Sequence, residues 1–198
     1  MDLREQLAFY GSYHNNFYNQ LIHLVFVPTI AFTVLVWCTY SGPLVASHDV
    51  SQLEEPWNRL LVPNLATALM LFYVSYYMLL DFMAGVTFML FLGGPLLLAA
   101  NYLYSVYGTS SWGPALGLHV FSWYMQLHPG HAIFEKRKPA LIDGLVQSFL
   151  TAPLFVWLEL QFWLGLRKGL REDVKERVAA RLAEMDGGNP LRQPLNKE

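Results

Sequence analysis

The sequence predicts an all-α fold: a polytopic membrane helix bundle with four to five spans and a C-terminal amphipathic surface helix. The first observation is composition, since 54% of the 198 residues are hydrophobic. The second is the uneven placement of the 13 Lys and Arg and the 15 Asp and Glu residues. Residues 6–48 carry none of these charges, residues 60–134 carry only Asp81, and half of all charges follow residue 166. A water-soluble domain spreads charge over its whole surface, so this distribution excludes a soluble globular enzyme and predicts membrane spans.

Five apolar segments are each about 20 residues long, the length that a helix needs to cross about 30 Å of hydrocarbon. They are residues 21–40, 61–80, 82–104, 114–134 and 144–166. Asp81 alone separates the second from the third, which predicts a tight helical hairpin. The fourth segment is the most polar, and it either crosses the bilayer or is partly re-entrant. Strand alternation is absent and a helix satisfies its own backbone groups in lipid, so we expect every span to be helical.

The end of the chain has a different pattern. Apolar residues recur there at every fourth position among Arg, Glu and Lys, until Gly187 and Gly188 end the repeat. The apolar positions are Leu170, Val174, Val178 and Leu182. This spacing predicts an amphipathic helix on the membrane surface or on the end of the bundle. We therefore expect one membrane-embedded domain over residues 1–166 and a polar amphipathic tail over residues 167–198.

The number of crossings decides which segments meet. If all five segments cross, the N-terminus, the Asp81 turn and the link over residues 135–139 lie on one side of the membrane. The same count puts the basic residues 136–138 on that side and a second basic group on the other, so the positive-inside rule does not decide the orientation. The second group is Arg167, Lys168 and Arg171.

Several histidines stand in or beside the apolar segments, where an ionisable side chain is costly. A single histidine in such a place is more often a hydrogen-bonded packing residue, but four of them fall on the side that the crossing count brings together. They are His14, His23, His128 and His131. Imidazole is a common ligand of iron and zinc, so this group predicts a metal site.

The spacing of the histidines requires the chain to bend. His14 and His23 are nine residues apart, which places them on opposite faces of one uninterrupted helix. We expect a helix start or break near Asn15 and Asn16, and a second break at Pro129–Gly130.

Two further side chains have more than one possible role. His119 lies about 18 Å of helix from His131, so it reaches the site only if the fourth segment is re-entrant. Glu135 follows His131 by four residues and faces the same way on a helix. It either completes the two-histidine, one-carboxylate arrangement of non-haem iron oxygenases or pairs with Arg137 or Lys138.

Two stretches of the sequence carry a recognisable pattern. They contain Tyr13-His14, Asn19, His23 and Pro28, and then Gly130-His131, residues 134–137, Pro139-Ala140-Leu141, Ala152-Pro153 and Glu159. With the order of apolar segments over residues 1–166, this pattern resembles the membrane 2-hydroxy fatty acid dioxygenases. The resemblance implies Fe(2+)-dependent α-oxidation, in which O₂ converts a long-chain 2-hydroxy fatty acid to the acid one carbon shorter. It also implies an integral protein of the lipid bilayer, in the endoplasmic reticulum of a eukaryote or the inner membrane of a bacterium.

The resemblance also suggests site residues. It implies that the metal ligands are His14, His23 and His131, with His119 as a further candidate. One more residue stands between Gln126 and Gly130 than in the family's pattern, which leaves open whether His128 or only His131 contacts the metal.

The remaining expectations concern the substrate. A 2-hydroxy acid can chelate iron through its carboxylate and hydroxyl, and its acyl chain can lie between apolar helices. Glu135 is the candidate catalytic carboxylate. Lys136, Arg137 and Lys138 either bind the substrate carboxylate or anchor the chain at the membrane surface.

Other classes of function fit the sequence less well. A net charge of −2 without a basic stripe outside the tail argues against a nucleic-acid partner. The single Cys38 excludes a disulfide framework and a thiolate metal site, and we expect no cleaved signal peptide. A di-iron desaturase would need more histidines at tight spacing. The alternative from another class is a non-catalytic lipid-binding membrane protein or a small transporter that uses histidine for packing.

Overall fold

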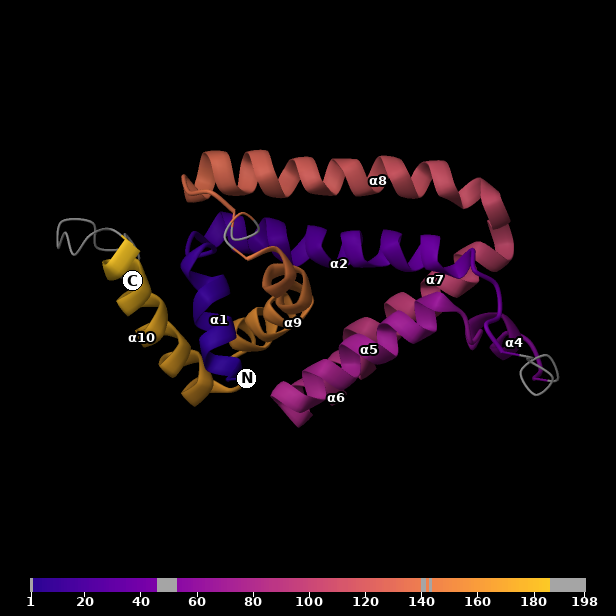
Figure 1. Cartoon of the computed structure of the whole chain (residues 1–198), viewed down its shortest axis with the longest axis horizontal. Coiled ribbons are helices and arrows are strands. Elements are labelled where there is room, and N and C mark those ends of the chain that lie inside the picture. Colours follow the sequence, from indigo (N-terminus) through magenta and orange to yellow (C-terminus); the bar gives the residue numbers. More distant parts are fainter. Residues whose placement is uncertain (1, 46–52, 140–141, 143, 186–198) are drawn as a thin grey trace.

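The computed structural model describes residues 2–45, 53–139, 142 and 144–185, and this part of the chain contains helices and no strand (Figure 1). The predicted all-α class is confirmed. The helices in chain order are α1 (Leu3–Ser12), α2 (Phe17–Thr39), α4 (Trp57–Leu60), α5 (Leu65–Leu80), α6 (Phe82–Phe88), η1 (Met89–Gly93), α7 (Gly94–Tyr107), η2 (Gly108–Ser111), α8 (Trp112–Met125), η3 (Gln126–Glu135), α9 (Leu145–Trp163) and α10 (Lys168–Met185).

The α2 helix lies side by side with α8 and its continuation η3, and the two run antiparallel (Figure 1). Asn16 begins α2, because its Oδ1 atom accepts a hydrogen bond from the backbone N–H of Tyr18 at 2.9 Å. Pro28 lies inside α2, yet the helix continues to Thr39. The first and fourth predicted segments are therefore helical and adjacent, as the site requires.

The second and third predicted segments form the expected hairpin. Asp81 has an extended backbone, and its Oδ1 atom accepts a hydrogen bond from the N–H of Ala84 at 2.8 Å. One residue thus ends α5 and caps α6. The chain continues from α6 through η1 into α7, and Gly108 then turns it toward α8 with a φ of 52°, a conformation that glycine adopts without strain.

Three helical stretches of the described chain are long and apolar enough to cross a membrane: Phe17–Thr39, Phe82–Glu135 and Leu145–Trp163. The second of them contains two predicted segments, because the chain turns within it at Gly108. The α5 helix is apolar but has 16 residues, which is about 24 Å of helix. This count is compatible with the predicted four to five spans.

The contacts of α9 favour the smaller number of crossings. Phe155, in the middle of α9, packs on Tyr10 of α1 with ring centroids 4.3 Å apart. Trp163, its last residue, stacks on Phe17 at the start of α2 with centroids 5.3 Å apart. Both the middle and the end of α9 therefore lie at the end of the bundle where α2 begins.

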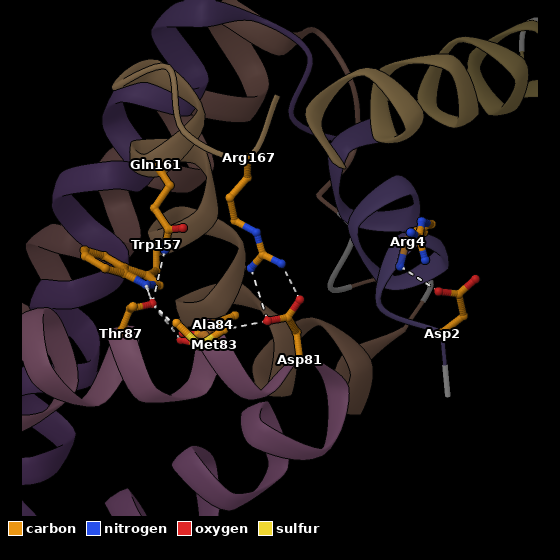
Figure 2. A network of polar contacts seen from close by, with 9 residues as sticks. All are labelled: Asp2, Arg4, Asp81, Met83, Ala84, Thr87, Trp157, Gln161 and Arg167. Carbon is orange, nitrogen blue, oxygen red and sulfur yellow. Dashed lines mark hydrogen bonds and ion pairs between the residues drawn. The ribbon is translucent and has the colours of Figure 1, made fainter. Parts of the chain in front are cut away.

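The residue that follows α9 agrees with this placement. Arg167 binds the carboxylate of Asp81 through both Nη atoms, with Nη1 donating at 3.2 Å, and Figure 2 shows this pair beside the bonds from Trp157 and Gln161 to Thr87 of α6. Arg167 thus lies on the same side as the Asp81 turn. Five complete crossings would place Arg167 and the Asp81 turn on opposite sides, so this contact favours four crossings over five.

The predicted amphipathic helix is confirmed as α10, and it packs on α1. Its buried apolar residues are Val174, Val178 and Leu182. Gly11 permits this approach, because a Cβ atom there would lie 2.8 Å from Cγ2 of Val178. Arg177 and Arg181 of α10 pair with Glu5 of α1. The expected helix end at Gly187–Gly188 lies outside the described residues.

Candidate metal centre

His14 lies in a bend between α1 and α2. The α1 helix ends at Ser12 and α2 begins at Phe17, so His14 lies between the two helices and His23 lies inside α2. Because of this bend, residues nine apart in the sequence face each other, with ring centroids 4.3 Å apart. The bend expected near Asn15 and Asn16 is present.

His131 reaches the same place because it lies in a π-helix. The expected break at Pro129–Gly130 is absent, because η3 continues α8 as a π-helix over Gln126–Glu135. A π-turn holds one more residue than an α-turn and so changes the direction in which later side chains point. Gly130 lets this segment approach α2, since a Cβ atom there would lie 2.6 Å from Oδ1 of Asn19.

The three rings form a compact buried group. One nitrogen of each ring lies within 4.8 Å of the other two. The three residues are buried, with exposed fractions of 2% for His14, 3% for His23 and 4% for His131. The His131 ring lies with its centroid 4.8 Å from that of His14 and 5.1 Å from that of His23. Among the described residues, no other group of His, Cys, Asp or Glu side chains has such spacing.

The hydrogen bonds of these rings leave nitrogens free for a ligand. Nδ1 of His14 lies 2.8 Å from the carbonyl of Tyr10, and Nδ1 of His23 lies 3.0 Å from the carbonyl of Asn19. Each Nδ1–H can donate to its carbonyl, which orients the ring as second-sphere bonds orient metal-bound imidazoles. Nε2 of His14 and Nδ1 of His131 are buried without a partner.

His14 is also in the protonation state that a metal requires. Burial, together with the neighbouring His23 and His131 rings, lowers the pKa of His14 well below its ordinary range. The ring is therefore neutral at pH 7, with a lone pair available. Tyr10, one turn earlier, stacks on it with centroids 4.0 Å apart. Tyr10 was not among the predicted site residues, although its four-residue spacing from His14 indicates this contact.

The Glu135 carboxylate accepts hydrogen bonds from residues at the start of α2. Its Oε1 atom accepts from the backbone N–H of Asn15 at 3.0 Å, and its Oε2 atom accepts from the N–H of Asn16 and from Nδ2 of Asn19, both at 2.9 Å. The carboxylate thus binds the N-terminus of α2, where unpaired N–H groups favour an anion. It fastens the end of η3 to the start of α2 and lies outside the metal-ligating group.

His119 is placed far from the three rings. Its Nδ1 atom lies 2.7 Å from Oγ1 of Thr33, and its Nε2 atom accepts from the indole N–H of Trp123 at 3.0 Å. Thr33 is ten residues beyond His23 on α2, which is about 15 Å of helix. His119 therefore positions Trp123 and is not brought to the metal-ligating group.

The remaining predicted residues lie at the surface. His128 is exposed, and its ring stacks on Tyr124 with centroids 5.5 Å apart, so of the two alternatives the structure brings only His131 to the group. Lys136 is exposed with a left-handed backbone. Neither Lys136 nor its basic neighbours Arg137 and Lys138 line the pocket at the histidines.

An apolar cavity of about 560 Å³ adjoins the histidines. Its walls come from α2, α5, α6, η1, α7, α8, η3 and α9, and include Val27, Val34, Met70 and Leu92. The histidines line a smaller pocket of about 60 Å³. Four residues line both spaces: Trp123, Gln126, Phe149 and Ala152. The arrangement thus combines a group of free ring nitrogens with a long apolar space, and the described residues that line either space include no charged side chain.

Comparison with known proteins gives a family for this arrangement. The family model described as 2-hydroxy-palmitic acid dioxygenase Mpo1-like matches residues 1–164. The chain is also similar to the 2-hydroxy-palmitic acid dioxygenase MPO1 of Saccharomyces cerevisiae, with 37% identity over 172 residues, or 86% of each chain. No solved structure matches the chain.

Proposed function

This chain belongs to the Mpo1-like family of 2-hydroxy-palmitic acid dioxygenases, and we propose that it is an Fe(2+)-dependent dioxygenase that converts long-chain 2-hydroxy fatty acids to acids one carbon shorter. The observation that carries this function is the three-histidine group at one end of an apolar cavity. Three neutral imidazoles leave several coordination positions of an octahedral ion open for substrate and O₂. Fe(2+) held there would supply the electrons that activate O₂.

The chain itself positions the substrate. The acyl chain occupies the cavity between α2, α5, α7, α8 and α9, where it is removed from water and contacts apolar side chains. The head group occupies the smaller pocket beside His14, His23 and His131. Trp123 and Gln126 line both spaces and therefore flank the point where the acyl chain meets the head group.

A membrane location follows from the same arrangement. The apolar helices are those of a membrane protein, and a substrate with a long acyl chain partitions into lipid. We place the enzyme in the endoplasmic reticulum if the source is a eukaryote and in the inner membrane if it is a bacterium.

The test combines metal analysis with an assay. Protein purified in detergent should contain about one equivalent of iron and should consume 2-hydroxyhexadecanoate under air but not under nitrogen. His131→Ala should remove most of the iron and the activity, because second and third ligands held at fixed geometry are needed for tight binding. His128→Ala is the matched control on the same π-helix, and it should retain both.

Two results would contradict the proposal. Full iron occupancy in His131→Ala would remove this histidine from the ligand set. A wild-type protein that binds 2-hydroxy acids but contains no redox metal and leaves the acid unchanged under air would indicate the non-catalytic lipid-binding alternative.

A further inference from the structure

The buried Ser and Thr hydroxyl groups of the described residues make the same kind of hydrogen bond, with one exception. Six of the seven buried Ser and Thr side chains donate to the backbone carbonyl three or four residues earlier, as is usual in helices. They are Ser12, Thr33, Thr39, Ser111, Ser122 and Thr151. Ser148 is 5% exposed, and its Oγ atom is buried without a partner.

The exception lies in the head-group pocket. Ser148 lines the pocket of about 60 Å³ together with His14, His23 and His131. A buried hydroxyl that makes no hydrogen bond costs free energy, so such a group is retained where a ligand satisfies it.

Two other donors in the pocket wall are already engaged. Nε2 of Gln126 donates to the carbonyl of Ser122 at 3.3 Å, and the indole N–H of Trp123 donates to His119. The described residues that line the pocket include no Lys or Arg, so a carboxylate entering it meets no cationic side chain. The Ser148 hydroxyl, which lines the pocket and makes no hydrogen bond, is then an available donor.

We propose that the Ser148 hydroxyl donates a hydrogen bond to the carboxylate of the bound 2-hydroxy acid and so orients its head group beside the three histidines. This inference rests on the proposed function. The bond is charge-assisted, because the acceptor is an ionised carboxylate, and such bonds are stronger than those between neutral groups. Ser148 binds the carboxylate end of the substrate, and the apolar cavity binds the uncharged acyl chain.

The experiment compares Ser148→Ala with Thr151→Val in the iron-loaded full chain in detergent. Thr151 lies less than one turn further along α9, is equally buried and lines neither pocket, so its variant removes a hydroxyl from the same helix without touching the site. Binding is measured without O₂ for two probes: 2-hydroxyhexadecanoate, and hexadecane-1,2-diol, which has the 2-hydroxyl but no carboxylate.

Ser148→Ala should bind 2-hydroxyhexadecanoate at least about tenfold more weakly than the wild type, which is about 1.4 kcal/mol. It should bind the diol within about twofold of the wild type, and its iron content should not change. Thr151→Val should match the wild type for both probes.

Equal affinity of the wild type and Ser148→Ala for the acid would overturn the inference, as would equal losses for the acid and the diol, which indicate a contact with the 2-hydroxyl or a change in packing. A wild type that binds the acid but does not convert it under air would instead contradict the proposed function and leave the Ser148 contact measurable.

Discussion

At the scale of single residues, Gly130 decides how closely the two histidine-bearing segments approach. Its missing side chain leaves room for Oδ1 of Asn19, and the Asn19 side chain cannot move aside easily, because its Nδ2 atom donates to Glu135 at 2.9 Å. His23 also lies near, with its Cε1 atom 3.5 Å from the position of a Cβ at Gly130. The metal-ligating group therefore depends on a residue that contributes no ligand.

Gly130→Ala should lower the free energy of unfolding by about 1–3 kcal/mol, the usual cost of overpacking, and should reduce the iron content. Gly117→Ala is the matched control on α8, because a Cβ there meets nothing within 4 Å. That control should be neutral or stabilising, since Ala favours a helix by about 1 kcal/mol over Gly. Thermal unfolding in detergent and iron analysis measure both effects. A Gly130→Ala variant with wild-type stability and iron content would contradict the close-approach argument.

The sequence predicted the three-histidine group better than it predicted the contacts around that group. His14, His23 and His131 stand out because an ionisable imidazole beside an apolar segment is costly, and this signal can be read from the local sequence. The contacts of Glu135 could not be predicted in the same way, because its partners are the backbone N–H groups of residues about 120 positions earlier. Ser148 carries no sequence signal at all, since its lack of a hydrogen bond is visible only in three dimensions.

At the scale of helices, apolar runs predicted the elements well, while their directions depended on tertiary contacts. The hairpin at Asp81 followed from one charged residue between two apolar segments, and the structure contains it. The π-helix η3 replaced an expected break, because Pro129 and Gly130 disfavour an α-helix but are both accommodated in a wider turn. The direction of α9 could not be read from its composition, which suits a crossing helix equally well.

The α2 helix also sets the length of the apolar cavity. Val27 lies near His23, whereas Val34 lines the cavity 11 residues beyond His23, about 16 Å further along the helix. A larger side chain at Val34 should therefore shorten the space for the acyl chain without touching the histidines.

Val34→Trp should reduce kcat/KM for 2-hydroxyhexadecanoate at least about tenfold and should leave a 2-hydroxy acid of about ten carbons within a few-fold of the wild-type value. Val25→Trp is the control, because Val25 is on the same helix, 53% exposed, and outside the cavity. Assays over a series of chain lengths measure the change. An equal loss for all chain lengths would show that the acyl chain does not extend toward Val34.

At the scale of the whole molecule, one ion pair joins the α5–α6 hairpin to the end of α9. Burial raises the pKa of Asp81, but the hydrogen bonds from Arg167 and from the Ala84 N–H outweigh it, so the pKa of this carboxyl is lowered overall. A carboxyl with a lowered native pKa stabilises the fold above its unfolded pKa of about 4 and loses that contribution as the pH falls through the lower native value.

Arg167→Met should therefore lower the free energy of unfolding by about 1 kcal/mol at pH 7, and the difference from the wild type should shrink as the pH falls below about 4. Arg59→Met removes an exposed pair with Glu55 and should change stability less at every pH. Unfolding in detergent as a function of pH measures both variants. A difference for Arg167→Met that stays constant down to the lowest pH would show that the Asp81 carboxylate is not its cause.

The hydrogen bonds between Glu135 and the start of α2 have a consequence for biosynthesis. His14 and His23 leave the ribosome more than a hundred residues before His131 and Glu135, and the start of α2 has no anion to hold it until that later segment arrives. A chain still in synthesis thus carries only two of the three histidines. Under the proposed function, metal loading would therefore follow the synthesis of residue 131 and would be one of the last events in the maturation of the enzyme.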